Sequence, residues 1–365
     1  MRIAMIGVRG IPAASGGAER VVEELSGELT GMGHEVLVYS RRSYVRDTAI
    51  LDGARRIVTP CLPGKHLEAI SHTALAVADA VARGVDLVHL HSPGPGLMSW
   101  LPALAGVPVV LTIHAPDWQR ARWSAPARAA LRAGLAIGSR CARAVTTVSQ
   151  PLAGELSRQL GRPVVYIPNA VRTPQSLPPD HTLAMGLEPG RFALTVARIV
   201  PEKRLDLLLR TWARTGGDWP LVVVGAVQDR AYGRLCQDLA GRANVRMLGE
   251  CTGDRLSALY QHCGMLVCPS ELEGMSLVLL EAAASGCCIL AADIPANSAA
   301  LGDSIVYFRC NDQDDLSRQV ERLVADPLAR RKFAGRAREK ARQYDWAISA
   351  RQLEQVYLSA GRKEL

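Results

Sequence analysis

The sequence predicts an α/β protein made of two doubly wound, Rossmann-like domains that face each other across a cleft. The first observation is length: the chain has 365 residues, of which 48% are hydrophobic, and single domains cluster at about 100–200 residues. The second is that short apolar runs alternate with helical patterns, which is typical of parallel βαβ units. The third is a break in this alternation near the middle of the chain, after which a second series begins.

The first series contains short runs rich in valine and isoleucine and bounded by turn residues. Strands are expected at Arg2–Gly7, Glu35–Ser40, Asp86–His91, Val107–His114, Ala144–Ser149 and Val164–Pro168. After the first strand, one face of a helix is formed by Val21, Val22, Leu25, Leu29 and Met32. Nearly continuous apolar strands are typical of a parallel sheet that helices cover on both faces.

Residues 172–190 interrupt the pattern. They contain four prolines and little periodicity, which predicts an interdomain linker. Beyond it, strands are expected at Phe192–Ala197, Leu221–Gly225, Val245–Gly249, Met265–Pro269 and Cys288–Ala292. We therefore expect one domain over residues 1–171 and a second over residues 191–343. Because ligands of such sheets bind at the carboxyl ends of the strands, the active site is expected in the cleft between the domains.

Composition bears on partners and location. Lys and Arg number 43 against 35 Asp and Glu, a net charge of +8, but an arginine bias with few lysines is weak evidence for a polyanionic partner, and no nucleic acid partner is expected. Nine cysteines without a C-x-x-C pair are typical of a reducing compartment. No run approaches the ~18 apolar residues of a membrane-spanning helix. We expect a cytoplasmic protein, with contact to the inner face of the cytoplasmic membrane left open.

A glycine-rich loop lies between the first strand and the first helix. It departs from the dinucleotide-binding pattern G-x-G-x-x-G. Gly16 and Gly17, directly before the helix, expose backbone N–H groups at its positive end, which is favourable for a phosphate. The alternative is an ordinary flexible turn.

Two glutamates in the second series are separated by one helical segment. Glu273 follows a predicted strand, and Glu281 lies about two turns into the next helix. At 1.5 Å per residue the pair spans about 12 Å, comparable to the distance from a ribose across a diphosphate to a hexose. The N–H groups that open this helix toward an anion belong to Gly274, Met275, Ser276 and Leu277. The alternative is two solvated glutamates and a helix cap.

Arg198 and Lys203 follow the first strand of the second series. Two cations at the carboxyl end of a strand can neutralise a pyrophosphate leaving group. A pair of surface cations is the alternative.

These segments resemble the retaining glycosyltransferases of family 4, which have the GT-B fold. In that family an E-x7-E pattern holds the donor sugar and ribose, which here implies Glu273 and Glu281. The resemblance further implies that Arg198 and Lys203 bind the diphosphate and that the loop with Gly16 and Gly17 faces it. Supporting matches are Gly33–Val36, Asp86–His91, Pro168–Val171 and Tyr344–Trp346. The last of these implies a helix over residues 344–365 that crosses back to the first domain.

The resemblance places His114 near the donor sugar and its anomeric centre, because the family has a histidine at the end of this strand. Asp117 and Arg120 are the candidate acceptor contacts. Arg9–Pro12, Lys65–His72 and Asp117–Arg120 resemble bacterial members tied to polysaccharide assembly, similar to rhamnosyltransferases.

The implied activity is transfer of a hexosyl unit from a nucleotide-diphosphate sugar to a hydroxyl, with retention and without a metal or other cofactor. The acceptor is expected to be a glycan, either free or lipid-linked, in cell-surface polysaccharide or glycoconjugate synthesis. Two other hypotheses stay open, a nucleotide-sugar epimerase of the same fold and a non-catalytic nucleotide-sugar-binding module.

Two further patterns have competing interpretations. Asp312–Asp314 spells the D-x-D metal signature, but a helix cap at Asn311 and Asp312 is favoured. Residues 118–143 combine six arginines with two tryptophans. They suit either anionic membrane headgroups or an arginine-decorated surface helix.

Overall fold

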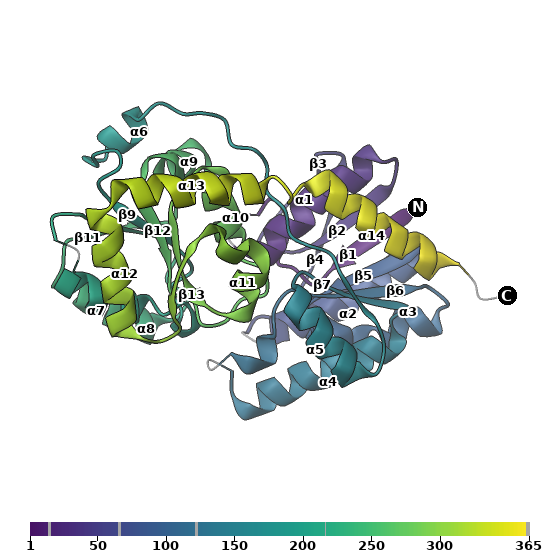
Figure 1. The fold of residues 1–365 in the computed structure, drawn as a ribbon. Coiled ribbons are helices and arrows are strands. Elements are labelled where there is room, and N and C mark those ends of the chain that lie inside the picture. Colours follow the sequence, from purple (N-terminus) through teal and green to yellow (C-terminus); the bar gives the residue numbers. More distant parts are fainter. Residues whose placement is uncertain (14–15, 65–66, 121–122, 216, 363–365) are drawn as a thin grey trace. The chain divides into compact units, whose positions relative to one another are not determined.

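The computed structural model describes residues 1–13, 16–64, 67–120, 123–215 and 217–362, and the chain divides into two compact units (Figure 1). Unit 1 comprises Met1–Asn169 and Trp346–Leu365, and unit 2 comprises Ala170–Asp345. Some positions of the patterns above lie outside the described residues, namely Ala14, Ser15, Lys65, His66, Arg122 and residues 363–365.

Within the described residues, unit 1 forms one sheet of eight strands in the order β3-β4-β2-β1-β5-β6-β7-β8. The strands are β1 (Arg2–Ile6), β2 (Glu35–Arg41), β3 (Ala49–Leu51), β4 (Ala54–Thr59), β5 (Leu87–His91), β6 (Val109–Ile113), β7 (Ala144–Thr147) and β8 (Val164–Tyr166). All neighbours pair in parallel except β3, which runs antiparallel to β4.

Helices cover both faces of this sheet. They are α1 (Gly17–Gly31), α2 (Leu67–Ala82), η1 (Pro95–Met98), α3 (Trp100–Leu104), η2 (Asp117–Gln119), α4 (Ala125–Cys141), α5 (Gln150–Leu160) and α14 (Trp346–Gly361). Apolar residues of α2, α4 and α5 share a core with β1, β5 and β6, while α14 packs against α1 and β6. The carboxylate of Glu354 on α14 lies 2.9 Å from His34 Nε2. Ser349, also on α14, donates a hydrogen bond to the carbonyl of Pro168 at 2.9 Å. The last helix is therefore part of unit 1.

Unit 2 forms, within the described residues, a sheet of six parallel strands in the order β11-β10-β9-β12-β13-β14. The strands are β9 (Ala193–Val196), β10 (Leu221–Val224), β11 (Val245–Gly249), β12 (Met265–Cys268), β13 (Ile289–Asp293) and β14 (Val306–Arg309). The helices are α6 (Asp180–Leu183), η3 (Pro201–Lys203), α7 (Leu205–Thr215), α8 (Arg230–Ala240), α9 (Gly253–His262), α10 (Leu277–Ala284), α11 (Pro295–Leu301), η4 (Gly302–Ser304), α12 (Gln313–Ala325) and α13 (Pro327–Ala341).

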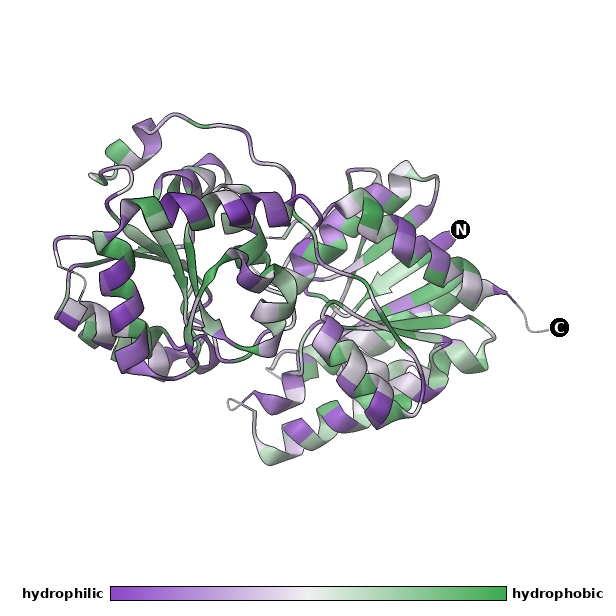
Figure 2. Cartoon of the chain, viewed as in Figure 1, coloured by the Kyte–Doolittle hydropathy of each residue, from purple (hydrophilic) through white to green (hydrophobic). Residues whose placement is uncertain are grey.

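Hydropathy follows these layers in each unit. Figure 2 shows the strands of both sheets as hydrophobic and the outer faces of the helices as hydrophilic. In unit 2 the core joins strand residues such as Val223 and Leu290 to helix residues such as Leu208 and Leu316. The predicted fold class, two Rossmann-like α/β domains with parallel sheets, is confirmed.

Three strands were not expected from the sequence, namely β3, β4 and β14. In β4 the apolar run is broken by Arg55 and Arg56. The structure nevertheless buries Arg56, whose guanidinium donates to the carbonyl oxygens of Asp47 at 2.9 Å and Ile11 at 3.0 Å. A buried charge with backbone partners is tolerated in a strand, and hydropathy alone does not reveal it.

The proline-rich segment 172–190 belongs to unit 2 and contains α6. Its backbone is tied to the end of α9, because the N–H of Leu177 donates to Gln261 Oε1 at 2.9 Å and the Leu177 carbonyl lies 3.0 Å from His262 Nε2. The segment predicted to be a linker is thus fixed along one domain, and the unit boundaries fall at residues 169/170 and 345/346.

Candidate active site

In each sheet, the strand that comes first along the chain lies beside a point where the direction of strand succession reverses. In unit 1 the reversal lies between β1 and β5, and in unit 2 between β9 and β12. The loops that leave neighbouring strands at such a point run in opposite directions and open a crevice where ligands of doubly wound sheets bind.

Three of the four charged residues predicted to contact the donor follow the two strands at the reversal of unit 2. Arg198 and Lys203 follow β9, and Glu273 follows the neighbouring β12. The backbone here is tightly packed: Gly225, at the end of β10, has a φ of +145°, and a Cβ on it would lie 1.9 Å from the carbonyl oxygen of Ala197. A glycine is therefore required where β10 meets the residue before Arg198.

Lys203 and Glu273 form an ion pair through Nζ and Oε1, and the two side chains are 16% and 12% exposed. Their mutual neutralisation is stronger than that of a surface pair because little water screens it. The structure thus brings together two of the predicted donor contacts. Arg198 donates to Gln228 Oε1 at 3.2 Å.

Glu281 lies in the second turn of α10 and is half-buried. The hydroxyl of Tyr260, on α9, donates to its Oε2 at 2.9 Å. Burial first, and then the charge of Glu281, raise the pKa of Tyr260 well above its ordinary value, so this hydroxyl keeps its proton. Tyr260 was missed in the sequence, where a single tyrosine on an amphipathic helix gives no functional signal.

The loop before α10 brings backbone donors to the same reversal. Gly274 and Met275 are buried, and Ser276 is the N-cap residue without a capping side-chain hydrogen bond. The first N–H groups of a helix have no partner inside it. The donors that start at Leu277 are therefore not capped by Ser276 and remain suited to an anion.

In unit 1 the predicted phosphate loop follows β1. Gly16 is the N-cap residue of α1 with a φ of +110°, and a Cβ there would lie 2.2 Å from Glu19 Oε2. Arg9 Nε and Glu19 Oε1 pair at 2.9 Å. Burial would raise the pKa of Glu19, but the hydrogen bond and charge of Arg9 lower it below its ordinary value. The positive end of α1 near Gly17 thus already holds a carboxylate, balanced by Arg9, a pairing that the sequence did not reveal.

His114 follows β6 and is half-buried. Its Nε2 lies 3.1 Å from Nδ1 of His91, at the end of the neighbouring β5. Burial lowers the pKa of His114 to about 4, although the charges of Asp117 and Glu19 act in the opposite direction. The imidazole is therefore neutral at pH 7.

Asp117 and Arg120, the predicted acceptor contacts, pair with each other. Arg120 Nε and Asp117 Oδ1 are 2.8 Å apart, and the side chains are 14% and 20% exposed. Neighbouring Trp118 is buried in the core of unit 1.

The D-x-D segment acts as a helix cap. The carboxylate of Asp312 accepts from the backbone N–H of Asp315 at 2.9 Å at the start of α12. Asp314 pairs with Arg214 at 3.6 Å on the surface. The capping interpretation is confirmed for Asp312.

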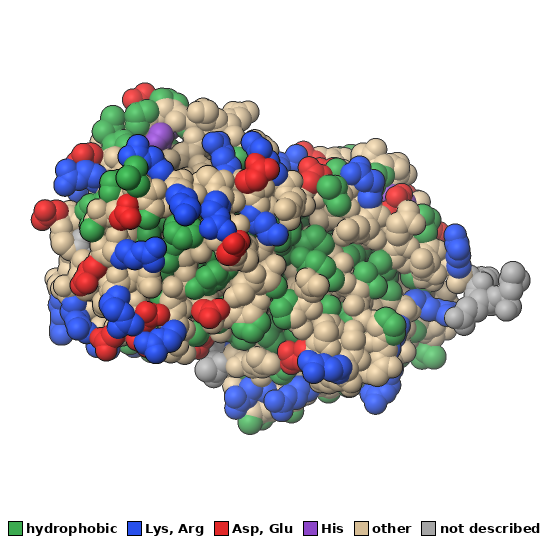
Figure 3. Space-filling view, viewed as in Figure 1, with side chains coloured by type: hydrophobic (Ala, Val, Ile, Leu, Met, Phe, Trp, Pro, Cys, Tyr) green, Lys and Arg blue, Asp and Glu red, His purple; other side chains and the backbone are tan. Residues whose placement is uncertain are grey.

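The arginine-rich segment separates into two faces. Leu135 of α4 is buried in the core, so the apolar side of this helix packs inward. Arg132, Arg140 and Arg143 are exposed, and Figure 3 shows Lys and Arg side chains gathered along α4 at the lower edge of unit 1. Within the described residues, no helix is long and apolar enough to cross a membrane.

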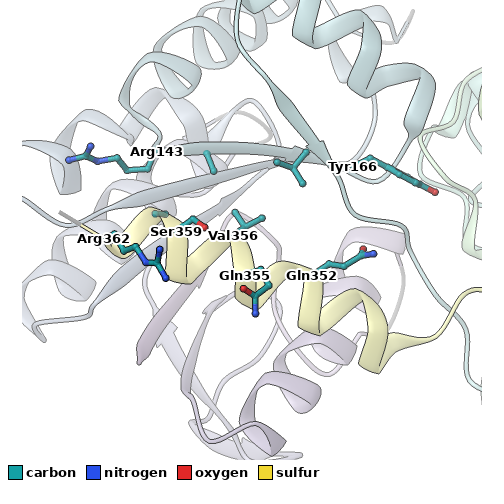
Figure 4. Close-up of a pocket in the computed structure, with 10 residues that line it drawn as sticks. Arg143, Tyr166, Gln352, Gln355, Val356, Ser359 and Arg362 are labelled. Carbon is teal, nitrogen blue, oxygen red and sulfur yellow. The ribbon is translucent and has the colours of Figure 1, made fainter. Parts of the chain in front are cut away.

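A groove of about 660 Å³ lies on unit 1 between β7, β8 and α14. Figure 4 shows Arg143 and Arg362 toward one end and Tyr166 toward the other. Its walls include Val165 and Val356, and none of the predicted site residues lines it.

Two Rossmann-like domains in one chain, with a C-terminal helix that packs on the first of them, define the GT-B class of fold. The model of the glycosyltransferase family 4 domain matches residues 15–175, and that of the glycosyl transferases group 1 matches residues 186–340. Together these models cover most of the chain, which therefore belongs to the family 4 glycosyltransferases. The protein is a glycosyltransferase.

The chain is similar to proteins of known activity over nearly its whole length. It is 26% identical to the D-inositol 3-phosphate glycosyltransferase of Rhodococcus erythropolis, covering 98% of this chain and 91% of that protein. It is 26% identical to the phosphatidyl-myo-inositol mannosyltransferase of Mycolicibacterium smegmatis, covering 94% and 90%. The fold is similar to that of Anabaena HepE, solved in complex with UDP-glucose, with a TM-score of 0.82, 18% identity, and coverage of 98% and 100%.

Proposed function

We propose that this protein transfers a hexosyl unit from a nucleotide-diphosphate sugar to a hydroxyl of a glycan or lipid-linked acceptor, with retention and without a metal. The pathway proposed is synthesis of cell-surface polysaccharide or glycoconjugate. The observation that carries the proposal is the pairing of Lys203 with Glu273 at the reversal of unit 2. Lys203 offers a cation for a diphosphate, and Glu273, next to it, offers a hydrogen-bond acceptor for sugar hydroxyls. The chain also belongs to the family 4 glycosyltransferases.

Unit 2 supplies the donor contacts in this proposal. Lys203 and Arg198 bind the diphosphate, and their charge stabilises it as it leaves. Glu273 accepts hydrogen bonds from the sugar, and Glu281 accepts them from the ribose, since one carboxylate can serve two hydroxyls. The N–H groups from Gly274 to Leu277 add an anion-binding helix start.

Donor binding then changes the partners of the ion pair. In the free protein Glu273 neutralises Lys203. With a donor bound, the diphosphate takes over the charge of Lys203, and sugar hydroxyls become the donors to Glu273. Each group exchanges one partner for another, so neither is left as an unpaired buried charge.

Unit 1 supplies the remaining contacts. Gly16 and Gly17 approach the diphosphate, and His114 contacts the sugar near its anomeric carbon. Asp117 and Arg120 orient the acceptor. No side chain serves as a covalent nucleophile in this mechanism: the leaving diphosphate oxygen accepts the proton of the attacking hydroxyl on the same face, which gives retention.

An anionic or lipid-linked acceptor is supported by the relatives and by charge. The names of two relatives specify inositol 3-phosphate and phosphatidyl-myo-inositol. Arg132, Arg140 and Arg143 lie exposed on or beside α4, where each basic side chain near an anionic surface contributes about 1 kcal/mol. Because the apolar side of α4 packs inward, contact with a membrane would be electrostatic and sensitive to salt.

A panel of nucleotide sugars tests the donor first. A ligand at 100 times its dissociation constant adds ~2.7 kcal/mol to the unfolding free energy, so a thermal shift identifies the base and sugar. Transfer to an acceptor extract, with and without a chelator, then tests the reaction, and NMR of the anomeric proton tests retention. Conversion of the donor sugar without an acceptor would identify an epimerase, and binding without any turnover would identify a binding module.

Sedimentation with anionic vesicles tests membrane contact. Binding at low salt that is reduced in an R132Q/R140Q/R143Q variant supports it. No binding by the unchanged protein would leave these arginines as an ordinary charged surface.

A further inference from the structure

Three histidines of unit 1 form a chain of contacts that leads from the core to the candidate site. His89 and His91 lie on β5, and His114 follows β6. The ring centroids of His89 and His91 are 4.0 Å apart, and those of His91 and His114 are 5.3 Å apart with nearly parallel planes. His89 and His91 are fully buried, whereas His114 is half-buried. The cluster therefore has one end that is open to a ligand.

The inner histidine is held at both ring nitrogens. His89 Nδ1 lies 2.6 Å from the hydroxyl of Tyr357 on α14, and its Nε2 lies 2.6 Å from Thr112 Oγ1. Because both contacts are hydroxyls, which can donate or accept, His89 is satisfied in either neutral tautomer. It provides a fixed surface on which the ring of His91 packs.

The middle histidine has one hydrogen bond. Its Nδ1 lies 3.1 Å from His114 Nε2, and its Nε2 is buried without a hydrogen-bond partner within the described residues. When both rings are neutral, only one proton lies between His91 Nδ1 and His114 Nε2. Either His91 donates it to His114 or His114 donates it to His91. The two arrangements differ in what is left at the far nitrogen of each ring.

The buried nitrogen of His91 decides between them. If His114 donated, His91 would carry its proton on Nε2 and bury an N–H without an acceptor. If His91 donates from Nδ1, its Nε2 keeps a lone pair instead. Buried N–H groups without a partner are rarer than acceptors without one, so the second arrangement is favoured.

We propose that His91 is a positioning residue that donates its Nδ1 proton to His114 Nε2 and so fixes His114 in the tautomer that carries a proton on Nδ1. His114 then presents an N–H donor toward the ligand rather than a basic lone pair. This inference rests on the proposed function, in which His114 contacts the donor sugar. It assigns His114 a hydrogen bond to a sugar oxygen and excludes it as the base that takes the acceptor's proton.

The charge state of the cluster agrees with this assignment. Burial lowers the pKa of His114 to about 4 and that of His91 well below its ordinary value. At neutral pH each ring has one proton, so the direction of the hydrogen bond is defined.

Tautomers can be measured without any substrate. In protein labelled with ¹⁵N-histidine, two-bond ¹H–¹⁵N spectra distinguish a protonated nitrogen from a bare one, and a His114→Gln variant assigns the signals. We expect His114 with a protonated Nδ1 and a bare Nε2. A protonated Nε2 on His114 would overturn the proposal, whether or not the protein transfers sugar.

Variants of His91 test the positioning role. Asparagine can place an amide donor near the position of the imidazole Nδ1, whereas leucine has similar bulk and no donor. We expect His91→Leu to lower kcat/KM about tenfold, the scale of one hydrogen bond, and His91→Asn to recover most of the loss. Equal losses in both variants, with equal losses in thermal stability, would mean that His91 is a packing residue and would refute the proposal.

His72→Leu is the matched control. His72 is also fully buried in unit 1, on α2, and within the described residues it forms no hydrogen bond with the three histidines. Its replacement is expected to leave the nitrogen signals of His114 unchanged. If activity were absent in every variant and in the unchanged protein, the proposed function would fail, while the tautomer measurement would still decide the proposal.

Discussion

Lys203 and Glu273 pair across the point where chain order reverses in the sheet of unit 2, one from the segment after β9 and the other from the segment after β12. Both side chains are less than one-fifth exposed. Each charge is therefore compensated in part by the other, and the loss of one leaves its partner with less compensation in a poorly solvated position. The pair consequently affects both stability and donor binding, and the two effects can be separated by variants.

We expect Lys203→Met and Glu273→Gln each to lower turnover by orders of magnitude and to lower the unfolding free energy by about 1–3 kcal/mol. In the double variant both charges are absent, so stability should recover in part while turnover stays low. Denaturant unfolding and initial rates of transfer measure the two quantities, and the double-mutant cycle gives their coupling.

Arg214→Gln is the control for this cycle. Arg214 and Asp314 pair at 3.6 Å with side chains 61% and 74% exposed, so a change within about 0.5 kcal/mol is expected. Near-normal transfer by either Lys203→Met or Glu273→Gln would rule out the assigned donor site.

Gly16 is expected not to tolerate a side chain. In Gly16→Ala the added Cβ would lie 2.2 Å from Glu19 Oε2 and 2.8 Å from Arg9 Nη2, on a backbone with a φ of +110°. The Arg9–Glu19 pair would have to move, and the donor KM should rise at least tenfold. Stability should fall by about 1–3 kcal/mol because of the unfavourable backbone conformation.

Gly154→Ala provides the comparison in the same unit. Gly154 lies inside α5, and a Cβ there would meet nothing within 4 Å. Alanine favours the helix by about 0.5–1 kcal/mol, so this variant should be slightly more stable and fully active. An unchanged KM in Gly16→Ala would remove the loop from the donor site.

The division into two domains and the positions of most strands could be predicted because both depend on local sequence patterns. Apolar runs such as Ala193–Val196 differ clearly from the turns around them, and the fold class was correct. The order of the strands in the sheet could not be predicted in this way, because the sequences of β9 and β12 do not indicate that these two strands are neighbours. Their pairing nevertheless brings Lys203 to Glu273, which are 70 positions apart.

Partners that act through tertiary contacts gave no sequence signal. Tyr260 contacts Glu281 because α9 and α10 pack together, and His91 contacts His114 because β5 and β6 pair. The motifs identified Glu281 and His114 as site residues, but they did not indicate that Tyr260 and His91 form hydrogen bonds with them. Such supporting residues depend on geometry that spacing along the chain does not contain.

Tyr260→Phe tests the support of Glu281. The variant keeps the ring in its buried site and removes the hydroxyl that donates to Glu281 Oε2 at 2.9 Å. A hydrogen bond to a charged group contributes about 1.5–3 kcal/mol, so Glu281 should become less well oriented. We expect the donor KM to rise about tenfold with a smaller change in kcat. An unchanged KM would show that Glu281 does not depend on Tyr260 or does not bind the donor.

The pH dependence of stability has a source outside the candidate site. His72 is fully buried on α2. Burial first, and then the nearby guanidinium of Arg41, lower the pKa of His72 to about 4, against smaller opposing effects of the Ser40 backbone and Glu68. As pH falls from about 6.5 toward 4, the unfolded chain binds a proton here that the folded chain does not. The folded state therefore loses stability through this window and gains it as pH rises.

We expect His72→Met to weaken this acid sensitivity. For a pKa of about 4 in the folded state and about 6.5 in the unfolded state, the loss between pH 7 and pH 5 is about 2 kcal/mol. Methionine cannot titrate and fills a buried site adaptably, so the variant should lose about 2 kcal/mol less than the unchanged protein over the same interval. His89, His91 and His114 titrate in both proteins and cancel in the comparison. Urea unfolding at pH 7 and pH 5 gives the four free energies, and equal losses in the two proteins would show that His72 titrates normally in the folded state.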